Sequence, residues 1–547
     1  MTEGARPESD GAARHVAPGY GAASAWAPLR RALLRALWIA AVASNVGTWI
    51  QDVSATWLMT SLASSPLMVA LVQTASTLPI FLLALPAGAL ADIVDRRRLL
   101  LVTQSWMLLA AAALGVLTIA GATTPWGLLV LTFILGLGAA MNAPAWQAII
   151  PELVPHVELP AAVALNSVGF NLARAVGPAL GGLVVGAIGS GAAFLLNAAS
   201  FLGVVGVLYG WRRAPRTSVL PAERVLGAIR AGVRYVRYAP ALRAVFVRVA
   251  AVVVSASALW ALLPVIARRE LGLGSAGYGL LLGCFGAGAV AGATLLPAAR
   301  RSLGVGRMIV TATVVLAVVL AWLAFERNVA LVSGLLVAAG GAWMTLMSTF
   351  NTATQSSVPS WVRARAMALY LLVLFGGMAV GSALWGTVAT HFGVRVALTC
   401  AAAGLAAGLV VVLRYELPEG TGPNLEPSRH WEAPLVASQP DHDRGPVLVT
   451  VEYHIDPRRS AEFVAALHAM RRIRRRDGAM QWGVFVDAAD PRRYVEFFLV
   501  ESWLEHLRQH ERVTVADRDV ENRVRAFHVG KGPPAVSHGI AAESVSQ

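Results

Sequence analysis

Long apolar runs repeat along the chain between Arg31 and Arg414, and short polar breaks separate them. A helix needs about 20 residues to cross roughly 30 Å of hydrocarbon, and each run is about that long. The approximate centres of twelve such runs are Gly47, Phe81, Ala111, Leu135, Ala173, Phe201, Val254, Gly286, Leu316, Val337, Gly376 and Ala406. The pattern predicts an all-α membrane protein with twelve transmembrane helices.

The pattern changes after the last apolar run. Residues 416–446 form a linker rich in proline, glycine and acidic side chains, which predicts irregular structure. Over residues 447–541 the predicted order is strand, helix, strand, strand, helix, strand. The strands are expected at 447–455, 480–486, 494–500 and 536–540, and the helices at 457–475 and from 503 onward. This order predicts a small ferredoxin-like α+β domain. Residues 542–547 are a short tail, and residues 1–28 are expected to be a disordered cytoplasmic segment.

Composition agrees with a membrane protein. The mean hydropathy is +0.61, with 56% hydrophobic and only 14% charged residues, whereas soluble domains carry about 25% charged residues. Cys284 and Cys400 lie singly inside apolar runs, so no thiolate metal site is indicated. The net charge of +14 is almost all arginine, which we interpret as coding bias. We expect no metal, no cofactor and no nucleic-acid partner.

Arginines fall mainly in alternate breaks between the runs. One set of breaks holds Arg96, Arg97, Arg98, Arg212, Arg213, Arg216, Arg300, Arg301, Arg307, Arg363 and Arg365. The opposite breaks are poorer in arginine, with the exceptions Arg268, Arg269, Arg327 and Arg395. The positive-inside rule therefore places both termini in the cytoplasm. We expect a multi-pass protein of a bacterial inner (plasma) membrane.

The chain also matches itself in order at an offset of about 200 residues, which is typical of a duplicated membrane unit. Gly88 with Arg96 and Arg97 aligns with Gly292, Arg300 and Arg301 at identical spacing. After the fourth run, Gln147, Pro151 and Gly169 align with Gln355, Pro359 and Gly377. The repeat predicts two six-helix halves, at residues 29–211 and 244–415.

Residues 212–243 connect the two halves. Val225, Ile229, Val233 and Val236 have the spacing of one helical face, and arginines lie beside them. We expect a basic cytoplasmic helix at the membrane interface that is attracted to anionic lipid head groups. A solvated basic linker is the alternative.

The break after the second run holds the motif Gly88-Ala-Leu-Ala-Asp92-Ile-Val-Asp95-Arg96-Arg97-Arg98. It resembles the loop between spans two and three of the major facilitator superfamily. The matching positions are Gly88, Leu90, Asp92, Arg96 and Arg97, and the departures are Ile93 and Asp95. The resemblance implies the major facilitator fold and a cytoplasmic latch between the halves, with Asp92 as its key acid.

A second motif, Gly177-Pro178-Ala-Leu-Gly181-Gly182, lies in the fifth run. Proline inside a spanning helix frees a backbone carbonyl, and glycine lets a neighbouring helix approach closely. The motif resembles the antiporter motif of drug and metabolite exporters in the same superfamily, with Ala164 and Ala173 in place of two further glycines.

The resemblance extends to the whole chain. Trp57-Leu-Met-Thr, residues 66–98 and the segment with His506, His510 and Glu511 resemble the transmembrane secretion effector family, which is similar to the enterobactin exporter. It implies a transporter and not an enzyme: a proton-coupled exporter of small amphipathic molecules, such as siderophores, drugs or secondary metabolites. The implied partners are the substrate, protons and the lipid bilayer. The alternatives are an importer, or a membrane-anchored enzyme or sensor acting through the C-terminal domain.

Two ionisable side chains are predicted near the middle of the membrane, where a charge costs roughly 2.5 to 3.5 kcal/mol. Asp52 lies in the first run near Asn45 and Gln51, and Arg174 lies in the fifth. We hypothesise that Asp52 takes up and releases the coupling proton, while Arg174 tunes it or binds anionic substrate groups. The alternatives are a permanent ion pair between the two, or an Asp52 that is hydrated near the outer surface.

Five amides lie where the implied fold lines its central cavity: Asn142, Gln147, Asn166, Asn351 and Gln355. They are candidates for substrate contacts, and helix-to-helix hydrogen bonding is the alternative for each. Arg248, early in the seventh run, is expected to reach the cytoplasmic surface with its guanidinium.

In the C-terminal domain, Trp503, His506 and His510 fall on one helical face. We expect this face to be solvated or to contact a second copy, because no carboxylate, nucleophile or ligand spacing supports a reaction. A pocket lined by these three residues is the alternative. The domain resembles dimeric α+β barrel domains such as the antibiotic biosynthesis monooxygenases, which work without metal or cofactor. We further expect a homodimer through this domain.

Overall fold

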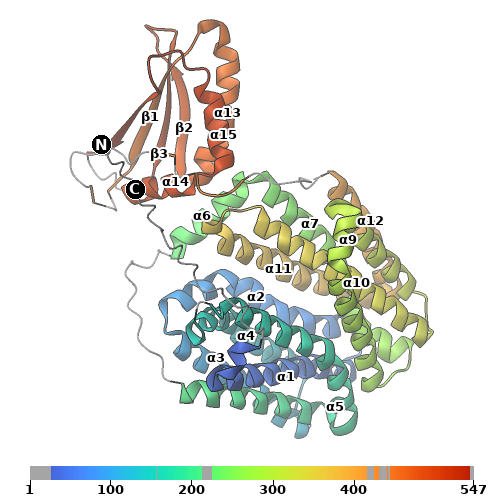
Figure 1. The fold of residues 1–547 in the computed structure, drawn as a ribbon. Helices are drawn as coiled ribbons and strands as arrows, with labels where there is room; N and C mark the ends of the chain where they lie inside the picture. The colour runs from blue at the N-terminus through green and yellow to red at the C-terminus, as the bar shows by residue number, and fades with distance from the viewer. Residues whose placement is uncertain are drawn as a thin grey trace, which may run out of the picture.

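The computed structural model describes residues 26–155, 157–211, 225–414, 424–428, 430–431, 440–441 and 444–542. These residues form a helical bundle with a smaller α/β unit beside it (Figure 1). The bundle consists of η1 (Ala27–Arg30), α1 (Ala32–Leu62), α2 (Pro66–Ile93), α3 (Arg96–Ile119), α4 (Pro125–Leu153), α5 (Leu159–Gly210), α6 (Val225–Tyr238), α7 (Pro240–Ala256), α8 (Ala258–Val265), η2 (Ile266–Glu270), α9 (Ser275–Leu323), α10 (Val329–Ser356), α11 (Ser360–Phe392) and α12 (Val394–Arg414). Most of residues 1–28, most of the linker at 416–446 and nearly all of the tail at 542–547 lie outside the described residues.

Within the described residues, ten helices are long and apolar enough to span a membrane, with α7, α8 and η2 counted as one. Two of them are far longer than one crossing needs: α5 has 52 residues and α9 has 49. Each is interrupted by one glycine with a positive φ, which is 82° at Gly189 and 73° at Gly304. Both breaks lie between two predicted run centres, so each long helix contains two of the predicted runs.

The two legs of α5 pack on the same turn of α1. Before the break, Gly181 lies against Ile50 of α1, and after the break Asn197 donates a hydrogen bond to the Gln51 side chain. The chain therefore folds back at Gly189 and returns along α1. Glycine suits this reversal because a side chain at positive φ is strained.

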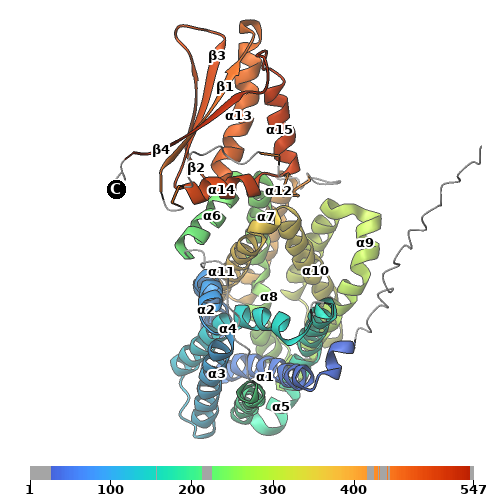
Figure 2. The same cartoon turned by 60° about the vertical axis from the view of Figure 1, so that its left-hand side comes forward.

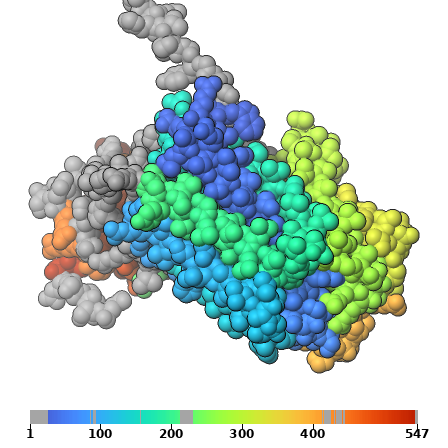
Figure 3. Space-filling model, turned by 90° about the horizontal axis from the view of Figure 1, so that it is seen from below, coloured from blue at the N-terminus to red at the C-terminus, as the bar shows by residue number. Residues whose placement is uncertain are grey.

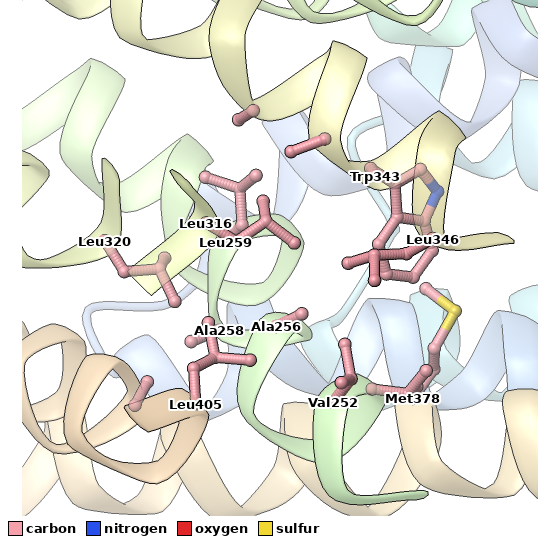
Figure 4. Packing of buried hydrophobic residues seen from close by; sticks show 14 of the residues in the cluster. Val252, Ala256, Ala258, Leu259, Leu316, Leu320, Trp343, Leu346, Met378 and Leu405 are labelled. Carbon is pink, nitrogen blue, oxygen red and sulfur yellow. The ribbon is translucent and has the colours of Figure 1, made fainter. Parts of the chain in front are cut away.

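The helices of the second half share one large apolar core. Side chains from α7 to α12 meet there, among them Val252, Leu259, Leu316, Trp343 and Leu405 (Figure 4). Viewed from below, the blue-to-green helices of the first half lie beside the yellow-green and orange helices of the second (Figure 3).

One residue of this half departs from its expected place. Arg248 of α7 is only 2% exposed. The expectation that it reaches the surface was wrong, because Arg248 lies on the buried face of α7, with Val245, Val249 and Val252.

The C-terminal domain is a four-stranded antiparallel sheet with helices on one face (Figure 2). The sheet order is β2-β3-β1-β4, and strands are present in all four predicted places. The second predicted helical stretch is two helices, because a capping box at Thr514 starts a new helix. The elements are β1 (Val447–His454), η3 (Pro457–Arg459), α13 (Ser460–Asp477), β2 (Ala479–Val486), β3 (Arg493–Val500), α14 (Trp503–Arg512), α15 (Val515–Arg525) and β4 (Ala535–Ile540).

The C-terminal domain docks on one end of the bundle, which we call the domain end; the opposite end is the far end. The contact is made with α6 and the start of α11 (Figures 1 and 2). Arg476 lies over the ring of the buried Tyr235, at 5.4 Å from its centroid. Arg512 lies 4.7 Å over the ring of Trp361, and Glu505 is 3.9 Å from Arg234. The basic helix α6 is therefore held between the bundle and the C-terminal domain.

Candidate functional site

The first half encloses a cavity of about 630 Å³ between α1, α2, α3, α4 and α5. Phe375 of α11 is its single lining residue from the second half. The polar lining residues are Ser44, Asn45, Thr48, Gln51, Asp52, Ser76, Gln104, Thr132, Asn142, Trp146, Gln147, Asn166, Ser167, Asn171 and Asn197. Apolar walls with a few convergent polar groups are typical of a small-molecule site.

Asp52 is the one ionisable side chain among the residues that line this cavity. It is exposed, and in the described part of the chain no side chain bonds to its carboxylate. Neighbouring amides are paired instead: Asn197 donates to Gln51, Gln104 donates to Asn142 at 3.2 Å, and Trp146 donates to Asn166 at 3.1 Å. The cavity thus combines one acid that has no side-chain partner among the described residues with several amides held by hydrogen bonds.

Two buried acceptor atoms in the cavity wall are left without a partner in the structure. They are the side-chain oxygen of Gln104 and the hydroxyl of Thr132. A buried polar atom without a hydrogen bond costs about 1 to 3 kcal/mol. A donor group on a bound ligand, or water, would remove this cost, so both atoms are suited to contact a polar substrate.

Arg174 does not line the cavity. It lies half-buried on α5, where α5 crosses α9 near Gly286. Among the described residues, no hydrogen bond or ion pair joins it to Asp52. Asn45, Gln51, Asn142, Gln147 and Asn166 do line the cavity. Asn351 and Gln355 of α10 do not; Gln355 donates to Asn351 at 2.6 Å along their own helix.

The two halves are joined at the far end. Arg268 donates to Thr60 at 2.8 Å, and Arg269 donates to the carbonyl oxygen of Ser64. The hydroxyl of Thr390 lies 3.2 Å from that of Ser65. In the sequence, Arg268 and Arg269 are exceptions to the positive-inside rule. A basic pair in an arginine-poor break is the signal in the sequence for this contact between the halves.

Glycines of the second motif bring three helices together near the far end. A Cβ on Gly177 would lie 2.5 Å from the Cβ of Trp49 in α1. A Cβ on Gly182 would lie 2.7 Å from the Cα of Gly279 and 2.6 Å from the carbonyl oxygen of Ser275, both in α9. Gly182 is therefore at the contact between the two halves, and Pro178 and Gly181 lie beside it in α5.

Part of the cavity lining is exposed. Ser167, Phe170 and Asn171 of α5 line it and are also exposed. These residues lie in the part of α5 closest to the domain end, whereas the far end is closed by the contacts described above. The exposed lining residues and the contacts between the halves therefore lie toward opposite ends of the bundle.

Known proteins agree with this architecture. The family model of the transmembrane secretion effectors matches residues 23–546, which covers both the bundle and the C-terminal domain. The chain belongs to this family. Membership makes the protein a transporter of the major facilitator superfamily.

The chain is similar to known transporters over most of their length. The staphyloferrin A transporter of Staphylococcus aureus is 23% identical over 70% of this chain and 96% of its own. The multidrug efflux pump Tap of Mycolicibacterium fortuitum is 26% identical over 67% of this chain and 91% of its own. A bacterial homologue of the lysosomal transporter Spinster, solved in an inward-facing, occupied conformation, has the same fold, with a TM-score of 0.56 at 16% identity over 71% of this chain and 97% of its own.

The latch motif of this secretion effector makes contacts within its own half. Arg96 donates to Glu152 of α4 at 2.8 Å, and Arg97 donates to the carbonyl oxygens of Leu208 and Tyr209 at the end of α5. Asp95, a departure from the family pattern, caps α3 by accepting from the backbone of Arg98. Leu90 packs on the neighbouring core and Gly88 faces open space. The side chain of Asp92 lies outside the described part of the chain.

The aromatic face of α14 points inward. Trp503 is 4% exposed and His506 is 1% exposed, so the expectation of a solvated or dimer-contact face was wrong. The His506 ring lies 4.9 Å from that of His510 and 4.7 Å from that of His538. No group of three or more histidine, cysteine or acidic residues within the described ranges has the arrangement of a metal site.

We expect the C-terminal domain to lose stability as the pH falls from about 6.5 to about 4. Burial and the neighbouring histidines lower the pKa of His506 to about 3, and burial and His538 lower that of His510 to about 4. Between these values and 6.5 the unfolded domain binds protons that the folded domain cannot, so stability is lost with falling pH. Hydrogen exchange of peptides from residues 447–540 in the full chain measures this.

The substitution His506→Leu should flatten that pH dependence, because it removes the most strongly shifted group. The matched control is His454→Leu, which changes a partly exposed histidine of β1. Equal pH dependence in both variants would contradict the assignment to His506.

Proposed function

We propose that this chain moves a small amphipathic molecule out of the cell in exchange for protons, by alternating access between its two halves. The observation that carries this is the 630 Å³ cavity with Asp52 as its one ionisable lining residue. The contacts between the halves at the far end support a state in which that end is closed. A proton and a substrate that use one cavity in turn would be coupled.

The topology that we propose has twelve crossings in two halves of six. The folding-back of α5 at Gly189 and the similar break of α9 at Gly304 support two crossings for each long helix. With both termini in the cytoplasm of a bacterial inner membrane, the domain end faces inward, and the structure is the inward-open state. Topology mapping that placed the C-terminal domain outside the cell would contradict this.

The substrate class that we propose is siderophores, drugs or related secondary metabolites. The relatives named for staphyloferrin A transport and multidrug efflux support it, as do the cavity's size and its mixed apolar and amide lining. The test is accumulation of a panel of siderophores and antibiotics in cells with and without the gene. If every compound accumulated equally in both, export of this class would be excluded.

For the C-terminal domain we propose a ferredoxin-like fold that pairs two copies of the chain. The sheet order β2-β3-β1-β4 supports the fold. The sheet face without helices carries Leu448, Phe485 and Phe497, and the last two rings are stacked at 5.4 Å. Phe485 is 63% exposed and would be covered in a dimer. Subunit counting in lipid nanodiscs should show two copies for the native chain and one for Phe485→Asp; a native chain that stays single would contradict the proposal.

A further inference from the structure

A second cavity, of about 560 Å³, lies where the C-terminal domain meets the bundle. Its walls are the end of α6, the start of α7 and the second half of α13. The lining residues are Arg237, Tyr238, Arg243, His468, Arg471, Arg472 and Arg475. We call this the arginine cleft. It is separate from the transport cavity, with which it shares no lining residue.

The arginine cleft concentrates positive charge without acidic partners. In the described part of the chain, no carboxylate forms an ion pair with any of its five arginines. Elsewhere in the same domain arginines are paired, such as Arg474 with Glu496 at 3.1 Å and Arg476 with Asp517 at 2.6 Å. The contrast shows that the domain has acids to pair with, and that the cleft lacks them.

The four α13 residues of the cleft share one helical face, since His468, Arg471, Arg472 and Arg475 follow a spacing of three and four residues. Like charges at this spacing destabilise a helix by about 0.2 to 0.5 kcal/mol per pair. Docking on α6 and α7 brings Arg237 and Arg243 to the same space. An anion in the cleft would remove this repulsion.

The position of the cleft indicates which anion. Arg237 precedes the membrane-spanning segment Pro240–Glu270 by three residues, and Arg243 lies in the first turn of that segment. Arginines at this depth lie at the level of the lipid head groups, where each attracts an anionic lipid by about 1 kcal/mol. Guanidinium groups bind phosphate oxygens in paired hydrogen bonds.

From this geometry we propose that the arginine cleft binds the phosphate of an anionic phospholipid and thereby ties the C-terminal domain to the membrane. The sequence pattern placed the lipid contact on the arginines of α6. The structure assigns a different role to one of them, because Arg234 faces Glu505 of the C-terminal domain. The site is instead shared between Arg237, the start of α7 and α13.

The test uses the full chain purified in detergent, with dioleoylphosphatidylglycerol as the probe and native mass spectrometry as the readout. Phosphatidylcholine serves as the neutral lipid, and glycerol 3-phosphate as the soluble phosphate. We expect the native chain to bind phosphatidylglycerol in preference to both. The variant R471Q/R472Q/R475Q should bind it more weakly by roughly fivefold for each arginine removed.

The matched control is R458Q/R492Q/R523Q, which removes three arginines of the same domain that lie outside the cleft. It should bind like the native chain. Should the cleft variant fold poorly, R237Q/R243Q tests the opposite wall and should also weaken binding. Unchanged binding in the folded cleft variant would overturn the proposal. So would equal binding of phosphatidylcholine, or binding of glycerol 3-phosphate as tight as that of the lipid.

Discussion

Replacing Asp52 with Asn is expected to abolish proton-driven transport while leaving the protein correctly inserted. Asn has nearly the same size and keeps the polar surface of the cavity, but it cannot take up a proton. Asp52 is the one ionisable residue in the cavity lining, so no neighbour there would substitute for it. If each transport cycle moves one positive charge inward, the membrane potential adds about 2.3 kcal/mol per 100 mV to the driving force for substrate export. Losing this contribution should lower the substrate gradient that the transporter can maintain by roughly 50-fold at 100 mV.

The measurement is substrate uptake into inverted membrane vesicles under an imposed pH gradient, together with the dissipation of that gradient when substrate is added. Asp52→Glu keeps the carboxyl and should retain coupling. Glu158→Gln is the matched control, because this acid lies outside the cavity and pairs with Arg31. If Asp52→Asn transported as well as the control, Asp52 would have no part in coupling.

The sequence predicted long apolar helices along residues 31–414, and several of these helices begin at residues with a local signal. Pro66 and Pro125 each occupy the first turn of a helix, where the missing backbone donor costs nothing. In the C-terminal domain, burial alternates along β1 and β3, since one face of the sheet is covered by helices. These signals need no knowledge of distant parts of the chain.

Side-chain partners were less accessible to sequence reasoning. Asp52 and Arg174 were placed at similar depth, but depth does not tell which way a side chain points around its helix. Asp52 lines the cavity, whereas Arg174 does not, and the backbone of Arg174 lies near Gly286 where α5 crosses α9. Likewise the partner of Arg96 is Glu152, which is far along the chain and belongs to no recognised motif. The same limit applies to the buried Arg248.

The periodic pattern of the sequence does not indicate that the aromatic face of α14 is buried. A helix face made of Trp503, His506 and His510 suits either a solvated surface or a protein core. Whether it is buried depends on which other elements pack against it. His538 of β4 meets His506 from across the domain. That contact depends on the sheet order, which is itself a result of the whole fold.

The substitution Gly182→Leu is expected to hold the two halves apart at the far end. Even a methyl group at this position would lie within 3 Å of the backbone of α9, so the helices must separate. An overpacked side chain costs about 1 to 3 kcal/mol. That cost would shift the equilibrium away from the closed far end by roughly 5- to 150-fold.

Crosslinking of a cysteine pair at Ser65 and Thr390 reports this closure, because the two hydroxyls are 3.2 Å apart across the halves. In a background without Cys284 and Cys400, Gly182→Leu should reduce the crosslinked fraction and transport together. Gly206→Leu is the matched control: it lies in the same helix, and a Cβ there meets nothing within 4 Å. Equal crosslinking in the two variants would mean that the contact between α5 and α9 does not decide whether the far end closes. The closed far end would then depend on Arg268 and Arg269, whose removal should open it in the same assay.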